Sequence, residues 1–232
     1  MSKLTHFRFC PFSRSIRILL AELDMPVALA EERPWEWRPV FLALNPSGDL
    51  PVLELADSVV VAGAYAISEY LGEMVRHAPL EDRLKDPFPG NAEDRAEMRR
   101  LVDWFHRKLD AEVTRDLLRE KLTNRLRPDQ AAGPPDAEVL RALRANLRYH
   151  LSYIGYLVDQ RRWLAGDEMS FADLAAAAHL SLLDYLDEIA WDQHPAVRNW
   201  YVRIKSRPSF RPLLADLAPG VPPPPHYADL DF

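Results

Sequence analysis

The residue in this sequence best suited to covalent chemistry is its single cysteine, Cys10, in the stretch Cys10-Pro11-Phe12-Ser13. Residues 4–9 carry β-forming aromatics in an alternating pattern, and residues 13–23 place apolar side chains at helical spacing. Cys10 is therefore expected where a strand ends and a helix begins. A helix N-terminus with cationic neighbours lowers the pKa of a thiol and makes its thiolate a nucleophile.

The composition excludes several other kinds of function. The chain has only 8 glycines in 232 residues and contains neither GxGxxG nor GxxxxGK[ST], so no phosphate-binding loop of these types is expected. A net charge of −6 argues against nucleic acid as a partner, and the seven histidines lack ligand spacing, which predicts no metal site. No long apolar run occurs, so we expect no membrane insertion. A lone cysteine and the absence of a signal peptide predict a cytoplasmic location.

The elements that would position Cys10 follow the order β-α-β-α-β-β-α. After the first strand and helix, the pattern predicts a strand at 27–30, a short helix at 41–44, strands at 51–55 and 59–61, and a helix at 65–74. Mixed strands and helices of this kind predict an α/β domain.

From Asn91 onward only helical spacing occurs. Asn91 and Asp136 are predicted to cap helices, and Ser170 with Asp173 is typical of a capping box. The predicted organisation is an α/β domain at 1–77, a linker at 78–90, an all-helical domain at 91–216 and a proline-rich extended tail at 217–232.

Two stretches carry residue types typical of binding surfaces. Trp35 and Trp37 lie in a proline-bounded loop beside Arg38, and tryptophan and arginine dominate binding hot spots; packing on the sheet is expected to account for one of the two tryptophans. Four consecutive prolines, residues 222–225, form a stiff segment before the end of the chain. That end carries aromatic, acidic and apolar residues, namely Tyr227, Asp229, Leu230, Asp231 and Phe232. Its apolar side chains would be exposed unless they dock on this subunit or on a partner.

The whole pattern over residues 1–216 resembles the cytosolic glutathione S-transferase family. The similar stretches are residues 48–53, 65–71, 163–167 with 170–173, and 195–210. The resemblance implies a thioredoxin-like N-terminal domain, a helical-bundle C-terminal domain with a buried capping motif, and a cis peptide bond before Pro51. It also implies a glutathione site formed by Cys10, Leu50, Pro51, Gly63 and Ala64.

The sequence departs from the family at Gly63 and Ala64. Members that bind glutathione carry an acidic or amide residue followed by serine there, and these groups hold the γ-glutamyl end of the peptide. Losing one or two hydrogen bonds to a charged ligand weakens binding by about one to three orders of magnitude. We therefore interpret the site as degenerate and Cys10 as structural, like many small buried cysteines. The alternative is a glutathione-dependent transferase or thiol reductase that uses Cys10, with Ser13 where dithiol enzymes have their second cysteine.

The tryptophan loop and acidic tail together resemble one non-enzymatic branch of the family, bacterial division regulators that bind the tubulin-like protein FtsZ. This resemblance implies a homodimer at the division site that binds FtsZ filaments and favours their curvature. It assigns partner contacts to Trp35 or Trp37, to Arg38 and to the tail residues 227 and 229–232. An adaptor for some other complex is a third hypothesis.

Overall fold

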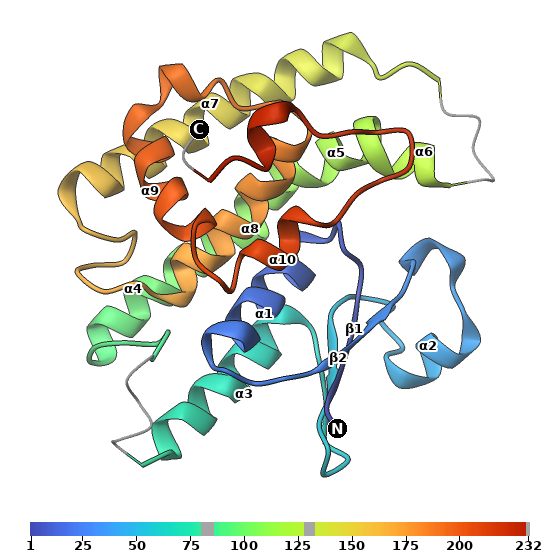
Figure 1. Ribbon diagram of the computed structural model, residues 1–232, viewed down its shortest axis with the longest axis vertical. Coiled ribbons are helices and arrows are strands. Elements are labelled where there is room, and N and C mark those ends of the chain that lie inside the picture. The colour runs from blue at the N-terminus through green and yellow to red at the C-terminus, as the bar shows by residue number, and fades with distance from the viewer. Residues whose placement is uncertain (80–85, 128–132, 231–232) are drawn as a thin grey trace. The chain divides into compact units, whose positions relative to one another are not determined.

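The polypeptide folds as two units, Met1–Pro89 and Gly90–Phe232, which we describe separately (Figure 1). The computed structural model describes residues 1–79, 86–127 and 133–230. The division after Pro89 falls within the stretch expected to be a linker, of which residues 80–85 lie outside the described part. The finer limits at 77, 90 and 216 stay predictions. Among the described residues no helix combines the length and apolarity needed to cross a membrane.

The first unit is a four-stranded mixed sheet with helices, as the sequence pattern predicts. Its elements are β1 (Lys3–His6), α1 (Pro11–Glu22), β2 (Ala28–Glu31), a 3₁₀ turn (Pro34–Glu36), α2 (Pro39–Leu44), β3 (Val52–Glu54), β4 (Val60–Ala62) and α3 (Ala64–His77). The strand order is β2-β1-β3-β4, with β1 parallel to β2 and antiparallel to β3. Leu4 and Leu53 lie opposite each other in this sheet and are both fully buried, so its centre is apolar.

The turn from β1 into α1 is tighter than the sequence pattern suggests. The strand ends at His6, three residues before the predicted end, because the N–H of Cys10 turns back to the carbonyl of Phe7 at 3.0 Å. Helix α1 then begins at Pro11, where proline is favoured because the first helical N–H has no partner in the helix. Cys10 is consequently the N-cap residue of α1.

The regular elements of the second unit, in its described part, are helices. Its elements are α4 (Ala92–Asp103), a π-helical segment (Trp104–Thr114), α5 (Arg115–Leu118), a second π-helical segment (Arg119–Thr123), α6 (Asn124–Leu126), α7 (Ala137–Gln160), α8 (Phe171–Tyr185), α9 (Pro195–Lys205) and α10 (Arg211–Leu214). Both predicted caps are confirmed: the side chains of Asn91 and Asp136 each accept two backbone N–H groups at the starts of α4 and α7. Every residue of α8 is buried, so this helix is the core of the unit.

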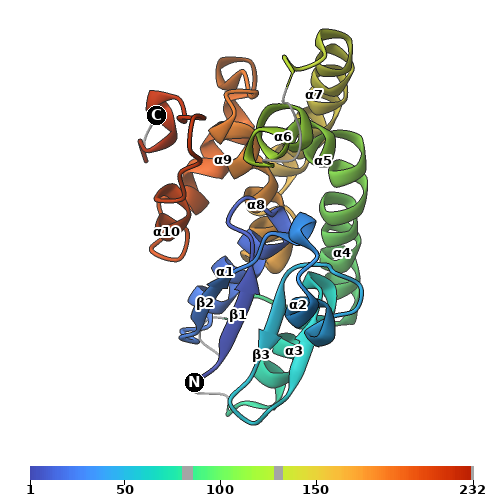
Figure 2. The ribbon, with the colours of Figure 1, turned by 90° about the vertical axis from the view of Figure 1, so that its right-hand side faces the viewer.

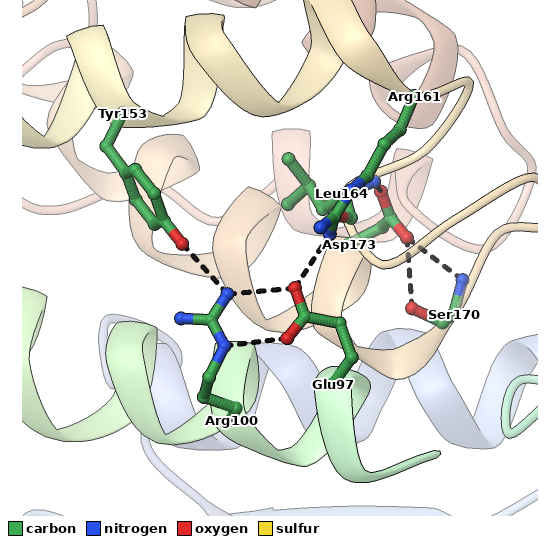
Figure 3. Close-up of polar contacts among 7 residues, drawn as sticks. All are labelled: Glu97, Arg100, Tyr153, Arg161, Leu164, Ser170 and Asp173. Atoms are coloured by element: carbon green, nitrogen blue, oxygen red, sulfur yellow. Dashed lines mark hydrogen bonds and ion pairs between the residues drawn. The ribbon is translucent and has the colours of Figure 1, made fainter. Parts of the chain in front are cut away.

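The start of α8 contains the predicted capping box, built around the fully buried carboxylate of Asp173. Figure 3 shows Asp173 beside Ser170 and Leu164. One carboxylate oxygen accepts the N–H of Leu164 at 3.0 Å and the indole N–H of Trp200 at 2.9 Å. The other accepts the N–H of Ser170 at 2.9 Å and its hydroxyl at 3.2 Å. Burial raises the pKa of Asp173, and these four donors oppose that rise.

The loop that supplies Leu164 is also tied to α4. Arg161 donates to the carbonyl of Leu164 at 2.9 Å and to Glu97 at 2.7 Å, and Glu97 pairs with Arg100 on the same helix (Figure 3). The hydrogen bond from Arg100, followed by the one from Arg161, holds the pKa of Glu97 down at about 2 against the effect of burial. The capping motif and α4 are therefore linked by a continuous polar network.

Candidate functional site

Cys10 stands at the N-terminus of α1 with partial exposure to solvent. Its extended backbone, φ −92° and ψ 121°, and the proline that follows place it directly before the first helical turn. The guanidinium of Arg14 is fully buried and donates from Nε to the carbonyl of Arg8 at 2.8 Å, within the same turn. Cys10 thus has the helix-terminal position that favours a thiolate.

Ser13 does not lie in a position suited to chemistry. It is fully buried, and its hydroxyl accepts the N–H of Phe7 at 3.3 Å, which closes the turn between β1 and α1. Ser13 is a residue within α1, whose N-cap is Cys10. Its role is to shape the turn that positions Cys10.

The segments around Pro51, Gly63 and Cys10 leave the sheet at one end. Thr5 pairs with Val52, and Val52 pairs with Ala62, so the ends of β1 and β4 and the start of β3 are neighbours. The bond between Leu50 and Pro51 is cis, as the family resemblance implies. The N–H of Gly63 donates to the carbonyl of Pro51 at 2.9 Å, which ties the start of α3 to the cis loop.

The start of α3 has no side-chain hydrogen bond to cap it and no acidic residue in its first turn. Gly63 has a left-handed φ of 86°, which disfavours other residues there, although a Cβ would find open space within 4 Å. Ala64 is buried and supplies no hydroxyl. The nearby hydroxyl of Ser68 donates to the carbonyl of Tyr65 at 2.9 Å. Backbone groups therefore join the start of α3 to the loop at Pro51, and neither Gly63 nor Ala64 supplies a polar side chain there.

The tryptophan loop places its two indoles in different surroundings. Trp35 lies in the 3₁₀ turn with its ring edge-on to Phe7, at a centroid distance of 5.1 Å. Trp37 follows in the left-handed conformation and is 64% exposed. Its ring covers Gly48, where an added Cβ would lie 3.2 Å from the indole. Trp37 is thus the exposed tryptophan, and it lies against the loop that leads to Pro51.

Arg38 follows Trp37 and is held by an acidic partner. Its Nε donates to Glu32 at 3.0 Å, and its exposed guanidinium forms an ion pair with this otherwise buried carboxylate. The ion pair with Glu32 therefore holds Arg38 in the loop, while much of its side chain stays exposed to solvent.

The predicted contact residues of the tail also differ in their exposure to solvent. Tyr227 is fully buried, whereas Asp229 is exposed and Leu230 is partly exposed. Asp231 and Phe232 lie outside the described residues. The tail is also less extended than predicted, because residues Pro225–Tyr227 form a short 3₁₀ helix. We therefore correct the role of Tyr227: it anchors the tail in the helical unit and has no exposed surface to offer a partner.

Two known protein domains match the two units. A model of the glutathione S-transferase N-terminal domain matches residues 9–74, and one of the glutathione S-transferase C-terminal domain matches residues 115–208.

Similarity to individual proteins extends over the full length, tail included. The chain is 46% identical to FtsZ-localized protein A of Caulobacter vibrioides, over 99% of this chain and 97% of that one. The solved structure of FzlA from C. crescentus is 44% identical, with a TM-score of 0.90, and the match covers 100% of this chain and 99% of that one. A crystal structure of a glutathione S-transferase from Sinorhizobium meliloti 1021 is 47% identical, with a TM-score of 0.93 and full coverage of both chains. Both domain models and these full-length relatives show that the chain belongs to the glutathione S-transferase family.

Proposed function

We propose that this protein is a non-catalytic member of its family that binds FtsZ filaments as a homodimer and regulates their curvature in bacterial cell division. The observation that carries the proposal is the 46% identity to FtsZ-localized protein A over 99% of the chain. The missing polar side chains at Gly63 and Ala64 support the non-catalytic part. The proposed location is the cytoplasm, at the division site.

The exposed residues of the two units support a binding role. Of the predicted contacts within the described residues, Trp37, Arg38 and Asp229 are exposed, and Trp35 and Leu230 are partly exposed. A large exposed indole beside a charged group is a typical centre of a binding hot spot.

A second copy could pack on the aromatic face of α7. Tyr149 and Tyr156 are exposed there, and Tyr153 lies between them with its ring 4.4 Å from that of Trp104. A twofold dimer would present each partner-binding surface twice, so one dimer could contact two filament subunits and set the angle between them.

The direct test is co-sedimentation with assembled FtsZ, combined with electron microscopy of the filaments. We expect the protein to pellet with FtsZ, to stay in the supernatant without it, and to convert straight filaments into curved ones. A protein that stays in the supernatant with assembled FtsZ would contradict the proposal. If the protein pellets with FtsZ but the filaments stay straight, the result would contradict only the curvature part of the proposal.

The position of Cys10 favours a second candidate function, a glutathione-dependent transferase or thiol reductase. A partly exposed thiol at the N-terminus of a twelve-residue helix can form a thiolate. That thiolate can attack a disulfide of glutathione, which forms a mixed disulfide with Cys10 and releases the other sulfur as a thiolate. Calorimetry decides between the two functions. Binding of glutathione tighter than millimolar, with a turnover that Cys10→Ser abolishes, would establish the enzyme.

The degenerate site predicts a gain of affinity in one variant. Ala64→Ser restores one hydroxyl at the N-terminus of α3, and a hydrogen bond to a charged group contributes about 1.5 kcal/mol. We expect glutathione to bind weakly to the wild type and about tenfold more tightly to this variant in a titration followed by NMR. Ala66→Ser is the matched control, because Ala66 is exposed in the same helical turn. Equal affinities in both variants would show that the hydroxyl at position 64 is not the missing contact.

A further inference from the structure

We propose that Asp184 and Lys205 form a buried socket that positions the C-terminal tail through His226. The partner-binding part of this inference rests on the proposed function, because it makes the socket responsible for how Asp229 and Leu230 meet a partner. The socket itself is defined by contacts within the helical unit, and these can be tested without FtsZ.

The socket is a buried ion pair. Asp184 in α8 and Lys205 in α9 are both fully buried, with Nζ of Lys205 at 3.5 Å from a carboxylate oxygen of Asp184. Burial raises the pKa of Asp184 and lowers that of Lys205, so burial alone favours the neutral form of each. A buried pair of this kind is stable only when further hydrogen bonds satisfy its remaining donors and acceptors. Trp191 supplies one of them, from its indole N–H to Asp184 at 2.9 Å.

His226 in the tail contacts both members of the pair. Its Nε2 lies 3.0 Å from Oδ1 of Asp184, and its backbone carbonyl accepts from Nζ of Lys205 at 3.0 Å. The side chain of His226 therefore contacts the carboxylate of Asp184, and its backbone carbonyl accepts a hydrogen bond from Lys205. Figures 1 and 2 show the dark-red tail before residue 231 beside α9, the helix that carries Lys205.

The neighbouring tail residues are fixed on either side of His226. The ring of Tyr227 packs edge-on to that of Tyr185 at 5.1 Å, and its hydroxyl donates to the carbonyl of Leu213 at 3.2 Å. Before the proline run, the hydroxyl of Tyr185 accepts the N–H of Ala218 at 2.9 Å and donates to the carbonyl of Val221 at 2.6 Å. These contacts therefore fix the tail both before and after the proline run at residues 222–225.

The exposed end of the tail follows directly from this anchor. The N–H of Asp229 donates to the carbonyl of His226 at 3.1 Å, the same carbonyl that accepts from Lys205. The hydroxyl of Ser206, next to Lys205, donates to the carbonyl of Val202 at 2.8 Å and lies 3.4 Å from the carbonyl of Leu230. His226, Asp184 and Lys205 are thus positioning residues for Asp229 and Leu230.

His226 allows a selective test, because its side chain is 31% exposed whereas those of Asp184 and Lys205 are fully buried. The variants are His226→Ala, His226→Gln, whose amide can still donate to Asp184, and Asp229→Asn, which changes the proposed contact and keeps the socket. Each is measured by hydrogen exchange of the amides of residues 226–230, by thermal unfolding and by FtsZ co-sedimentation.

We expect His226→Ala to raise tail exchange at least tenfold and to weaken FtsZ binding about tenfold, with His226→Gln restoring most of both. Asp229→Asn should weaken binding and change exchange less than twofold. Unchanged exchange in His226→Ala would overturn the socket as the tail anchor. Raised exchange with unchanged FtsZ binding would overturn its role in positioning the contact. A wild type that fails to bind FtsZ would refute the proposed function, and the exchange results would still test the socket.

Discussion

Replacing Trp37 by alanine is expected to weaken binding to FtsZ filaments by about a hundredfold without destabilising the fold. The indole is 64% exposed and lies over Gly48 at the edge of the cis-proline loop, so the folded protein gains little from it. Truncating a tryptophan at the centre of an interface costs about 2–4 kcal/mol, which corresponds to a loss of thirtyfold to a thousandfold in affinity. Exposed substitutions change stability by only about 0.5 kcal/mol. Co-sedimentation over a range of FtsZ concentrations measures the first effect, and urea unfolding measures the second.

Trp35→Ala is the matched control, because it also removes a tryptophan side chain. Trp35 lies only two residues from Trp37, but in a packed position. The ring of Trp35 stacks edge-on with Phe7, which itself packs on Phe9 at 5.9 Å. Trp35 is only partly buried, so removing its ring is expected to cost about 2 kcal/mol of stability in the first unit, less than the loss for a fully buried aromatic. Conversely, the Trp35→Ala protein that remains folded should bind FtsZ normally. If Trp37→Ala binds as tightly as the wild type, the exposed indole is not a filament contact.

The sequence predicts most of the fold because its signals are local. The order of strands and helices follows from apolar spacing, and the caps at Asn91, Asp136 and Ser170 follow from residue type alone. The end of β1 is missed because the turn depends on hydrogen bonds from Phe7 to Ser13 and from Cys10 to Phe7. The π-helical segment Trp104–Thr114 is also missed, because its buried residues Phe105, Leu109 and Val113 recur every four residues, a spacing that is also typical of an α-helix.

The candidate site is less predictable because burial is a property of the folded chain. Trp35 and Trp37 are two residues apart, yet Trp35 lies in the 3₁₀ turn against Phe7, whereas Trp37 has a left-handed backbone, with φ 48°, and is exposed. Tyr227 resembles an exposed tail residue until Tyr185 and Leu213 are brought against it. Asp184 and Lys205 give no sequence signal as a pair, because α8 and α9 bring them together only after folding.

Asp173→Asn is expected to be nearly as damaging as Asp173→Ala, although asparagine has almost the same shape. Each oxygen of the carboxylate accepts two hydrogen bonds, from Leu164 and Trp200 on one side and from Ser170 twice on the other. An amide must turn its NH₂ group toward one of these pairs, so at least one backbone N–H faces another donor in a fully buried site. Each buried polar group left unpaired costs about 1–3 kcal/mol, so we expect a loss of about 3 kcal/mol or more.

The matched control for this prediction is Asp167→Asn, the same substitution at an exposed position in the preceding loop. It should change the free energy of unfolding by no more than about 0.5 kcal/mol, whereas both Asp173 variants should unfold at much lower urea concentration. Near-ultraviolet circular dichroism reports on Trp200, which loses its hydrogen bond to Asp173 in the alanine variant. An Asp173→Asn protein as stable as Asp167→Asn would mean that the four donors do not require an anion. The capping motif would then contribute through its backbone geometry alone.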